Sequence, residues 1–384
     1  MSEKLARLEK FNVGLQPDLP DRQKVFWRDG ENILFRDSAI MPVPGQIPLN
    51  SFGMKFTALC STGTHVFLGL EKDVVCWNVS TQTSTILTSE AITQNGGWHF
   101  VAWGSWVIGV QNGHLYKITT SAITAIDDAP TGIKFLLKVK NFILAVSADT
   151  VYWCSDDDVE TWTPDATNLA GDLFIRDCSS EIIAGAALES YALLATKDEL
   201  IRVNYLSRPY VFGYQKLFSG AGAYTDKCLA VLNSSIFGFG PSGIWVCDGE
   251  SVQFIDRNAV NTTLIEEMNL NRTVDCLVGV WQTLRFVLFF VPLKSGTKCF
   301  AFNLDSSTWA QLTLSRSLQD KEYWITPNGV LYRDDFRFAG VAPTNAGSLE
   351  VYESAYAGIG YGTEPYGPRS YGGKIFLDVE EASR

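Results

Sequence analysis

The chain has 384 residues, of which 46% are hydrophobic and 19% charged, so it is long enough and apolar enough to bury one or more cores. Aromatic residues reach 12%, with 32 Gly and 14 Pro, a mixture that favours many short strands joined by turns over long helices. The net charge of −11 argues against a protein that grips nucleic acid through its phosphates.

The N-terminal residues 3–10 have a helical pattern, but no continuous apolar stretch of the kind found in a secretory signal peptide. No apolar run reaches transmembrane length, and the densest one, Phe286–Leu293, predicts a buried strand. The eight cysteines form no CxxC pair, and none lies close to a His. We interpret them as small buried residues of a protein that folds in a reducing cytosol.

A pattern of two short strands around a turn recurs seven times along the chain. An apolar strand enters a turn of Gly, Asp, Asn, Lys or Ser, and a second apolar and aromatic strand leaves it. The turns begin, 32 to 54 residues apart, at Lys72, Asn112, Ala148, Asp198, Ser242, Gly296 and Asn328. Short strands at this period predict an all-β fold, a β-propeller with seven blades favoured and six to eight as the range.

Two of these turns carry Asn-Gly, at residues 112–113 and 328–329. This pair is typical of a type I′ hairpin turn, in which both central residues have positive φ. A fainter eighth copy at Gly30–Gly45 is predicted to supply the strand that closes the ring between the chain ends. A two-sheet sandwich is the alternative fold, and Thr262–Leu270, with Thr caps, is the second helix candidate.

The predicted organisation has three parts. Residues 1–50 form an N-terminal arm and the first strands, residues 51–335 the propeller, and residues 336–384 an irregular C-terminal extension rich in Tyr and Gly. Its tyrosines recur mostly five residues apart, a spacing that fits neither a helix nor a strand. Since Tyr is a common interface anchor, we interpret these tyrosines as a contact surface rather than a flexible linker. They are Tyr352, Tyr356, Tyr361, Tyr366 and Tyr371.

No motif for catalysis, cofactor binding or metal binding is found, and the chain is predicted not to be an enzyme. The sequence has no HExxH, GxSxG or Walker loop, and the Gly cluster at Ser219–Asp226 is weak as a phosphate cradle. The paired carboxylates are interpreted as solvated turns, because neighbouring strand residues point to opposite faces. Asp156–Glu160 could bind calcium through alternating carboxylates, but it lacks the Gly and the full loop of a dedicated site.

The segment SDDDVETW resembles the Asp-box of sialidase-like propellers, S-x-D-x-G-x-T-W. Ser155, Asp157, Thr161 and Trp162 match it, and Val159 stands where Gly is expected. The resemblance implies a structural turn, in which the Asp caps the turn and the Trp packs between strands. A shorter echo, DSSTW, lies at Asp305–Trp309. The arginine triad and the Tyr/Glu pair of a sialidase cannot be assembled from this sequence.

A second resemblance covers roughly residues 25–314. VFWRDGENILFRDSAIMPVPGQIPL, from Val25, is similar to the start of tail proteins from short-tailed bacteriophages. The middle segments follow the order of blades in the tail hub, or nozzle, family, also called packaged-DNA stabilization proteins. They are YALLATKDELIRVNY, FSGAGAYTDKCLAVLNSSIFGFGPSGIWVCDGESVQFID, LIEEMN and RFVLFFVPLKSGTKCFAFNLDSSTWAQL.

This second resemblance implies a homo-hexameric ring below the portal and adaptor proteins, carrying fibres or a needle. The ring forms a channel that retains packaged double-stranded DNA and lets it pass during ejection, and the protein is located in the virion tail after assembly in the host cytoplasm. An acidic protein suits a channel through which DNA slides, because it repels the phosphate backbone. We therefore expect the surface facing the lumen to be net negative.

Two other functions stay open at the level of sequence. A sialidase-like or carbohydrate-binding propeller would place exposed Trp or Tyr beside carboxylates at one end of the axis. A tail channel would instead bury most of the 11 Trp between blades and leave exposed apolar surface on the flanks. A scaffold for cellular partners is the third option, although the Gly-His and Trp-Asp pairs of WD repeats do not recur.

Overall fold

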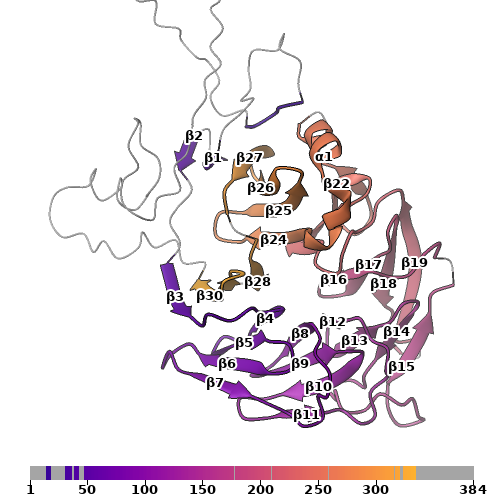
Figure 1. Ribbon diagram of the computed structural model, residues 1–384. Helices are drawn as coiled ribbons and strands as arrows, with labels where there is room; N and C mark the ends of the chain where they lie inside the picture. Colours follow the sequence, from indigo (N-terminus) through magenta and orange to yellow (C-terminus); the bar gives the residue numbers. More distant parts are fainter. Residues whose placement is uncertain are drawn as a thin grey trace, which may run out of the picture.

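The structure is a computed structural model that describes residues 14–18, 31–36, 39–42, 47–176, 178–208, 210–257, 259–314, 316–320 and 323–333. These residues contain seven antiparallel sheets of four strands each, together with one two-stranded hairpin. The innermost strands of successive sheets contact each other in a closed cycle, from the first sheet round to the seventh and back. The sheets are therefore the blades of a seven-bladed propeller, as predicted (Figure 1).

Within each of the first six blades the strands run outward from the axis in chain order. Blade 1 holds β4 (Ala58–Ser61), β5 (His65–Gly69), β6 (Val74–Asn78) and β7 (Ser84–Leu87), and blade 2 holds β8 (Trp98–Trp103), β9 (Trp106–Gln111), β10 (His114–Ile118) and β11 (Ile123–Ala125). Blade 3 holds β12 (Phe135–Val139), β13 (Phe142–Val146), β14 (Thr150–Trp153) and β15 (Gly171–Phe174), and blade 4 holds β16 (Ala184–Ala187), β17 (Tyr191–Ala195), β18 (Glu199–Tyr205) and β19 (Phe212–Ser219). Blade 5 holds β20 (Leu229–Leu232), β21 (Ser235–Gly240), β22 (Gly243–Cys247) and β23 (Val252–Phe254), and blade 6 holds β24 (Leu277–Trp281), β25 (Phe286–Leu293), β26 (Gly296–Asn303) and β27 (Thr308–Leu312). The seven hairpins read from the sequence are the second and third strands of the seven blades.

The seventh blade closes the ring with strands from both ends of the described chain. Its order is β28 (Leu318–Asp320), β29 (Tyr323–Ile325), β30 (Val330–Arg333) and β3 (Ile47–Ser51), so the strand from the N-terminal side is the outermost one. The prediction that Gly30–Gly45 supplies the closing strand is wrong. Within that segment, β1 (Ile33–Arg36) and β2 (Ala39–Pro42) pair with each other and form a separate hairpin.

The arm that contains this hairpin lies along the outer edge of blade 6 and not in blade 7. The Leu15 backbone N–H donates to the Trp309 carbonyl at 2.8 Å, and the Asn32 N–H donates to the Gln311 carbonyl at 2.8 Å. Leu34 is fully buried in the same core as the blade 6 strands. The arm residues therefore satisfy backbone groups of β27 that would otherwise form an open sheet edge.

The two Asn-Gly turns differ from each other. At the first, Asn112 has φ +50° and Gly113 φ +82°, the type I′ combination that was predicted. At the second, only Gly329 has positive φ, and its N–H donates to the Thr326 carbonyl at 2.9 Å. The ring of Pro327 fixes its φ at about −65°, which favours a type I turn followed by a Gly in the left-handed conformation. The type I′ prediction is thus wrong at the second turn, because the preceding proline decides the turn type.

The hydrophobic core lies between the blades rather than at the axis. Five clusters of buried apolar residues fill the spaces where neighbouring sheets face each other. Eight of the ten tryptophans in the described residues are buried there: Trp77, Trp98, Trp153, Trp162, Trp245, Trp281, Trp309 and Trp324. Each blade gains its stability from contact with the next, so a single blade would leave its apolar faces in water.

One α-helix, α1 (Asn261–Glu267), and one 3₁₀ helix, η1 (Leu270–Asp275), lie between blades 5 and 6 in the described part of the chain. The predicted helix at Thr262–Leu270 is confirmed, but it ends earlier and is not capped by Thr. The Asp18 carboxylate accepts hydrogen bonds from the N–H groups of Thr262 (2.6 Å) and Thr263 (3.2 Å). The other helix candidate, residues 3–10, lies outside the described residues, and none of the described helices is long and apolar enough to cross a membrane.

Candidate functional site

The Asp-box-like segment forms the turn that follows β14. The Ser155 N–H donates to the Thr161 carbonyl at 2.8 Å, which closes the turn, and the Asp158 N–H donates to the Ser155 carbonyl at 3.1 Å. Trp162 and Val159 are both buried in the cluster between blades 2 and 3, and the Trp162 indole N–H donates to the Val159 carbonyl at 2.8 Å. The bulk of Val159, where the family has Gly, fills part of that cluster.

The carboxylate that caps this turn belongs to Asp158, whereas the resemblance implied Asp157. Asp158 accepts from the Glu160 N–H at 3.0 Å and from the Thr161 hydroxyl at 2.7 Å, and these bonds, the Thr161 hydroxyl first, lower the pKa of Asp158. Asp157 instead has φ +56° and accepts from the Asn141 side-chain amide at 3.1 Å. Asp157 contributes to the turn through its left-handed backbone conformation rather than through the charge of its side chain.

A second carboxylate fixes the far side of the same turn. Asp128, in the connection from β11 to β12, accepts from the backbone N–H groups of Trp162 (2.7 Å) and Thr163 (2.8 Å) and from the Thr163 hydroxyl. These bonds, that from the Thr163 hydroxyl first, lower the pKa of Asp128. The cluster is therefore a fold element that joins blade 3 to the connection preceding it, and the described residues contain no group of three or more side chains placed to hold a metal ion.

Similar capped turns recur between the third and fourth strands of other blades. The side-chain oxygen of Asn78 (Oδ1) accepts from two backbone N–H groups, each at 2.9 Å. The side chains of Asp248 and Asn303 each accept from two backbone N–H groups in blades 5 and 6. Thr119 fills this position in blade 2 with its hydroxyl. The DSSTW echo is one of these turns, with Asn303 rather than Asp305 as the capping residue. An Asn, Asp or Thr at the first position of the turn, two and three residues before the N–H groups that it caps, was the signal in the sequence.

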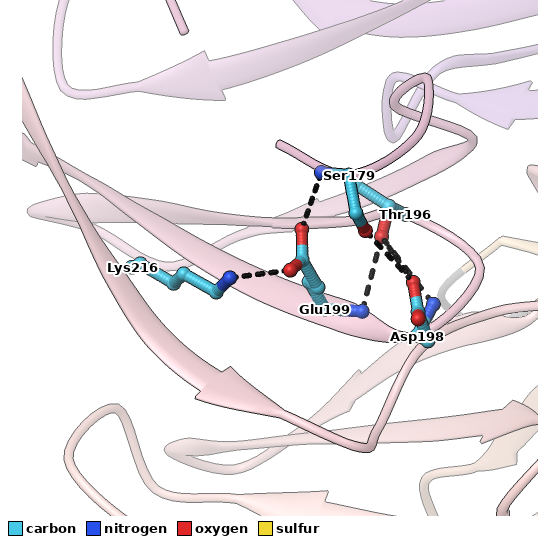
Figure 2. A network of polar contacts seen from close by, with 5 residues as sticks. All are labelled: Ser179, Thr196, Asp198, Glu199 and Lys216. Carbon is cyan, nitrogen blue, oxygen red and sulfur yellow. Dashed lines mark hydrogen bonds and ion pairs between the residues drawn. The ribbon is translucent and has the colours of Figure 1, made fainter. Parts of the chain in front are cut away.

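Blade 4 holds a polar network that the sequence analysis did not identify (Figure 2). Glu199, which is 5% exposed, forms an ion pair with Lys216 on the neighbouring strand and accepts from the Ser179 N–H at 2.9 Å. Asp198 accepts from the Ser179 hydroxyl at 3.3 Å, and the Thr196 hydroxyl accepts from the Glu199 N–H at 3.0 Å. Figure 2 shows all five side chains around the turn between β17 and β18.

The contacts of this network join parts of the chain that lie far apart in sequence. The hydrogen bond from Lys216 lowers the pKa of Glu199, and the same bond raises the pKa of Lys216. The network therefore ties the connection between blades 3 and 4 to the β17–β18 turn.

A cleft of about 370 Å³ lies on blade 2, lined by the β9–β10 turn and the connections on either side. Gln111 and Asn112 on its wall donate side-chain hydrogen bonds to the Gln94 carbonyl, each at 3.2 Å. His114 and Asp127 also line the cleft and are exposed. Since its polar wall is used to hold a neighbouring loop, the cleft gives no sign of a built catalytic centre.

The cysteines are buried, as predicted, with the exception of the half-buried Cys178, and none forms a disulfide. Burial raises the pKa of Cys76 to about 11 and that of Cys154 to about 12, which leaves these thiols protonated and unreactive at neutral pH. The five tyrosines proposed as a contact surface, Tyr352, Tyr356, Tyr361, Tyr366 and Tyr371, lie outside the described residues.

Comparison with known proteins supports the fold. No protein-family model and no curated protein matches the sequence. The structure resembles a chain in the crystal structure of the Mitotic Checkpoint Complex, with a TM-score of 0.50 and 13% identity, over 78% of this chain and 96% of that one. It also matches PorZ, a bacterial surface component of the type-IX secretion system of Porphyromonas gingivalis, with a TM-score of 0.47 and 10% identity, over 73% of this chain and 37% of that one. The first likeness shows the propeller fold alone, and nothing is inferred from the second.

Proposed function

We propose that this propeller is a structural subunit of a phage tail, a hub or nozzle that assembles as a homo-hexameric ring below the portal and adaptor. The ring retains packaged DNA and lets it pass during ejection. The proposal rests on the sequence resemblance over residues 25–314, and the fold is compatible with it.

The observation that carries the proposal is how the two parts of that resemblance pack together. The similar N-terminal segment contributes Leu34 and Phe35, and the similar middle segments form blades 4, 5 and 6. All of them belong to one continuous hydrophobic cluster. The regions that resemble the tail family in sequence therefore make one physical unit, which a chance likeness of scattered strands would not require.

The distribution of aromatic and apolar side chains also favours a structural role. Most of the tryptophans are buried between blades, which leaves few for stacking against a sugar ring. Ile86 and Phe174 lie on the outermost strands β7 and β15, and each side chain is 50% exposed. Apolar surface on the flanks is where contacts between sister subunits of a ring would form.

The test is an assembly experiment with the full chain and the portal and adaptor proteins encoded in the same genome. We expect electron microscopy to reveal a six-fold ring of this chain on the portal–adaptor complex, and mass spectrometry to find the chain in purified virions. The electrostatic map of that ring is expected to be net negative along its lumen. A lumen lined by clustered Lys and Arg contradicts the DNA-passage role.

An activity assay separates this function from the alternative. The chain is incubated with a panel of sialosides and other glycans, and both hydrolysis and binding are measured. We expect neither. A monomer that turns over a glycoside, together with its absence from virions, would replace the tail function with the carbohydrate-active one.

A further inference from the structure

The cleft on blade 2 brings polar residues from three segments of the chain around one cavity of about 370 Å³. Its walls are the β9–β10 turn, the connection from β7 to β8 and the connection from β11 to β12. This volume lies near the lower end of the range for small-molecule sites, so the cleft has room for a ligand the size of a long side chain. What it binds depends on which polar groups of its wall are not already used by the protein.

Gln111, at the end of β9, offers the cleft an acceptor and no donor. Its side chain is 2% exposed, and its Nε2 donates to the Glu71 carbonyl and, at 3.2 Å, to the Gln94 carbonyl. Two carbonyl groups at one end of the amide require the nitrogen there, which places Oε1 at the other end. Oε1 has no hydrogen-bond partner among the described residues, and it is not fully enclosed. This buried side chain therefore presents an open oxygen to the cleft that it lines.

Asn112, the next residue, repeats this arrangement at the surface. Its Nδ2 donates to the Gln94 carbonyl at 3.2 Å and to the Asn95 carbonyl at 3.4 Å, so both N–H groups of the amide are directed to the neighbouring connection. Its Oδ1 accepts from no group in the part of the chain that the structure describes. The two adjacent amides thus use their donors to hold the protein together and leave their oxygens available.

Asp127 gives the cleft a negative charge. It is exposed on the connection from β11 to β12, and it forms no ion pair with another described residue. The described residues that line the cleft include no lysine or arginine. The other titratable side chains of the lining are Tyr116, which is buried, and the exposed His114, whose unprotonated ring nitrogen can accept a hydrogen bond. The cleft is therefore rich in acceptors and suits a cation better than a phosphate or carboxylate.

Apolar side chains complete the lining of the cleft. Leu115 and Ile126 are 2% and 8% exposed, and both pack in the cluster between blades 2 and 3, which fixes their positions. Ala129 and Pro130 add smaller apolar groups. A ligand with a short aliphatic stem and a cationic head can place the stem against these side chains while the head meets the acceptors, as long basic side chains do on protein surfaces.

We propose that this cleft binds a guanidinium group, with the Asp127 carboxylate as its counter-ion and the oxygens Gln111 Oε1 and Asn112 Oδ1 as further acceptors. A guanidinium is planar and carries five N–H donors, so it can serve several oxygens at once, whereas an ammonium has three donors around a point charge. An arginine side chain of a protein partner and a free small guanidinium compound both carry this chemistry. The site is independent of the tail-channel proposal.

The test titrates the full chain at pH 8 with propylguanidinium and measures binding by saturation-transfer NMR of the ligand. We expect saturable binding, weaker binding of butylammonium, and no binding of propylurea, which is planar but uncharged. Asp127→Asn should weaken the apparent affinity by about threefold to fivefold, as expected for the loss of an exposed ion pair. Asp127→Lys, which places a cation in the cleft, should abolish binding. Asp156→Asn removes an exposed carboxylate that does not line the cleft, so this matched control should bind like the wild type.

Two further arms locate the ligand and identify its source. Thr93→Trp fills the cleft from an exposed position of the β7–β8 connection and should prevent binding without removing an acceptor; if this variant does not fold, Asp127→Lys alone tests the location. Tighter binding of the peptide acetyl-Gly-Arg-Gly-amide than of propylguanidinium identifies an arginine of a protein partner, and equal or weaker binding identifies a free compound. The proposal is overturned if propylguanidinium does not bind, if butylammonium or propylurea binds as tightly, or if Asp127→Lys binds like the wild type.

Discussion

Blades 1 to 3 and blades 4 to 6 bury their apolar residues in different ways. Between blades 1 and 2, and again between blades 2 and 3, the buried side chains form separate clusters, each confined to one seam. In blades 4, 5 and 6 a single cluster runs through all the seams and also takes in Leu15, Leu34 and Phe35 from the arm. The same blade architecture thus yields two kinds of core.

The arm adds to this difference. It lies along the outer edge of blade 6, so that side of the propeller has an additional covering layer, whereas no arm segment in the described residues covers the outer strands of blades 1 to 3. In a repeat fold, stability is close to a sum of blade and seam contributions. A seam that shares its core with its neighbours and with the arm should therefore unfold together with them.

The largest expected effect is the loss of a large side chain from the continuous cluster. Trp281 is fully buried at the end of β24, with its ring 5.3 Å from that of Trp324. Trp281→Ala should lower the free energy of unfolding by about 3–5 kcal/mol. In the seam between blades 2 and 3, Trp106 is half-buried beneath the Lys117 ammonium at 4.8 Å, and Trp106→Ala should cost only about 1–2 kcal/mol. Chemical denaturation of both variants measures the contrast, and equal losses would contradict it.

A smaller effect is expected from the arm itself. Leu34→Ala removes a fully buried side chain from the layer over blade 6 and should cost about 2–3 kcal/mol. Hydrogen exchange should rise in blades 4 to 6 and stay unchanged in blades 1 to 3. Faster exchange spread evenly over all seven blades would show that the arm does not stabilise one side in particular.

The two Asn-Gly turns, in blades 2 and 7, provide a matched pair of substitutions. Asn112→Ala places alanine at φ +50° and removes the bonds to the Gln94 and Asn95 carbonyls, which should cost about 1–2 kcal/mol. Asn328→Ala lies at a position without positive φ and should cost less than about 0.5 kcal/mol. Urea midpoints of the two variants decide whether the turn type, rather than the dipeptide, sets the cost.

The smallest effect is the pH dependence of the blade 4 network. The pKa of Glu199 is lowered from its ordinary value of 4.5 by Lys216. Its contribution to stability is therefore fully present above pH 4.5 and is lost as the pH falls through the folded-state value. Glu199→Gln should have a lower Tm than the wild type at pH 7, and the gap should narrow in acid. A gap that stays constant down to pH 3 would remove the ion pair as its cause.

Much of the propeller could be predicted from local pattern. The turns of the two-strand hairpins are visible in the sequence, and the number of these turns equals the number of blades. The closing strand was placed too early, since Gly30–Gly45 contains short apolar runs like the one in Ile47–Ser51. The choice between them depends on which segment buries its apolar side against blade 6, and that is a matter of long-range packing.

The polar network of blade 4 could not have been predicted in the same way. Ser179, Glu199 and Lys216 stand in unrelated local sequences. They meet because β18 pairs with β19 and because the connection between blades 3 and 4 passes beside the β17–β18 turn.

The sequence by itself determined that this chain makes short antiparallel strands grouped in repeats. The signals are local, because apolar residues and turn formers follow one another within about ten positions. Strand pairing within a blade follows from that, because neighbouring strands are joined by short turns. Tertiary structure alone decided which strand closes the ring, which edge the arm covers and which charges meet in the blade 4 network. Those choices depend on burial and on contacts between residues as much as 294 positions apart, such as Leu15 and Trp309, and no local propensity encodes them.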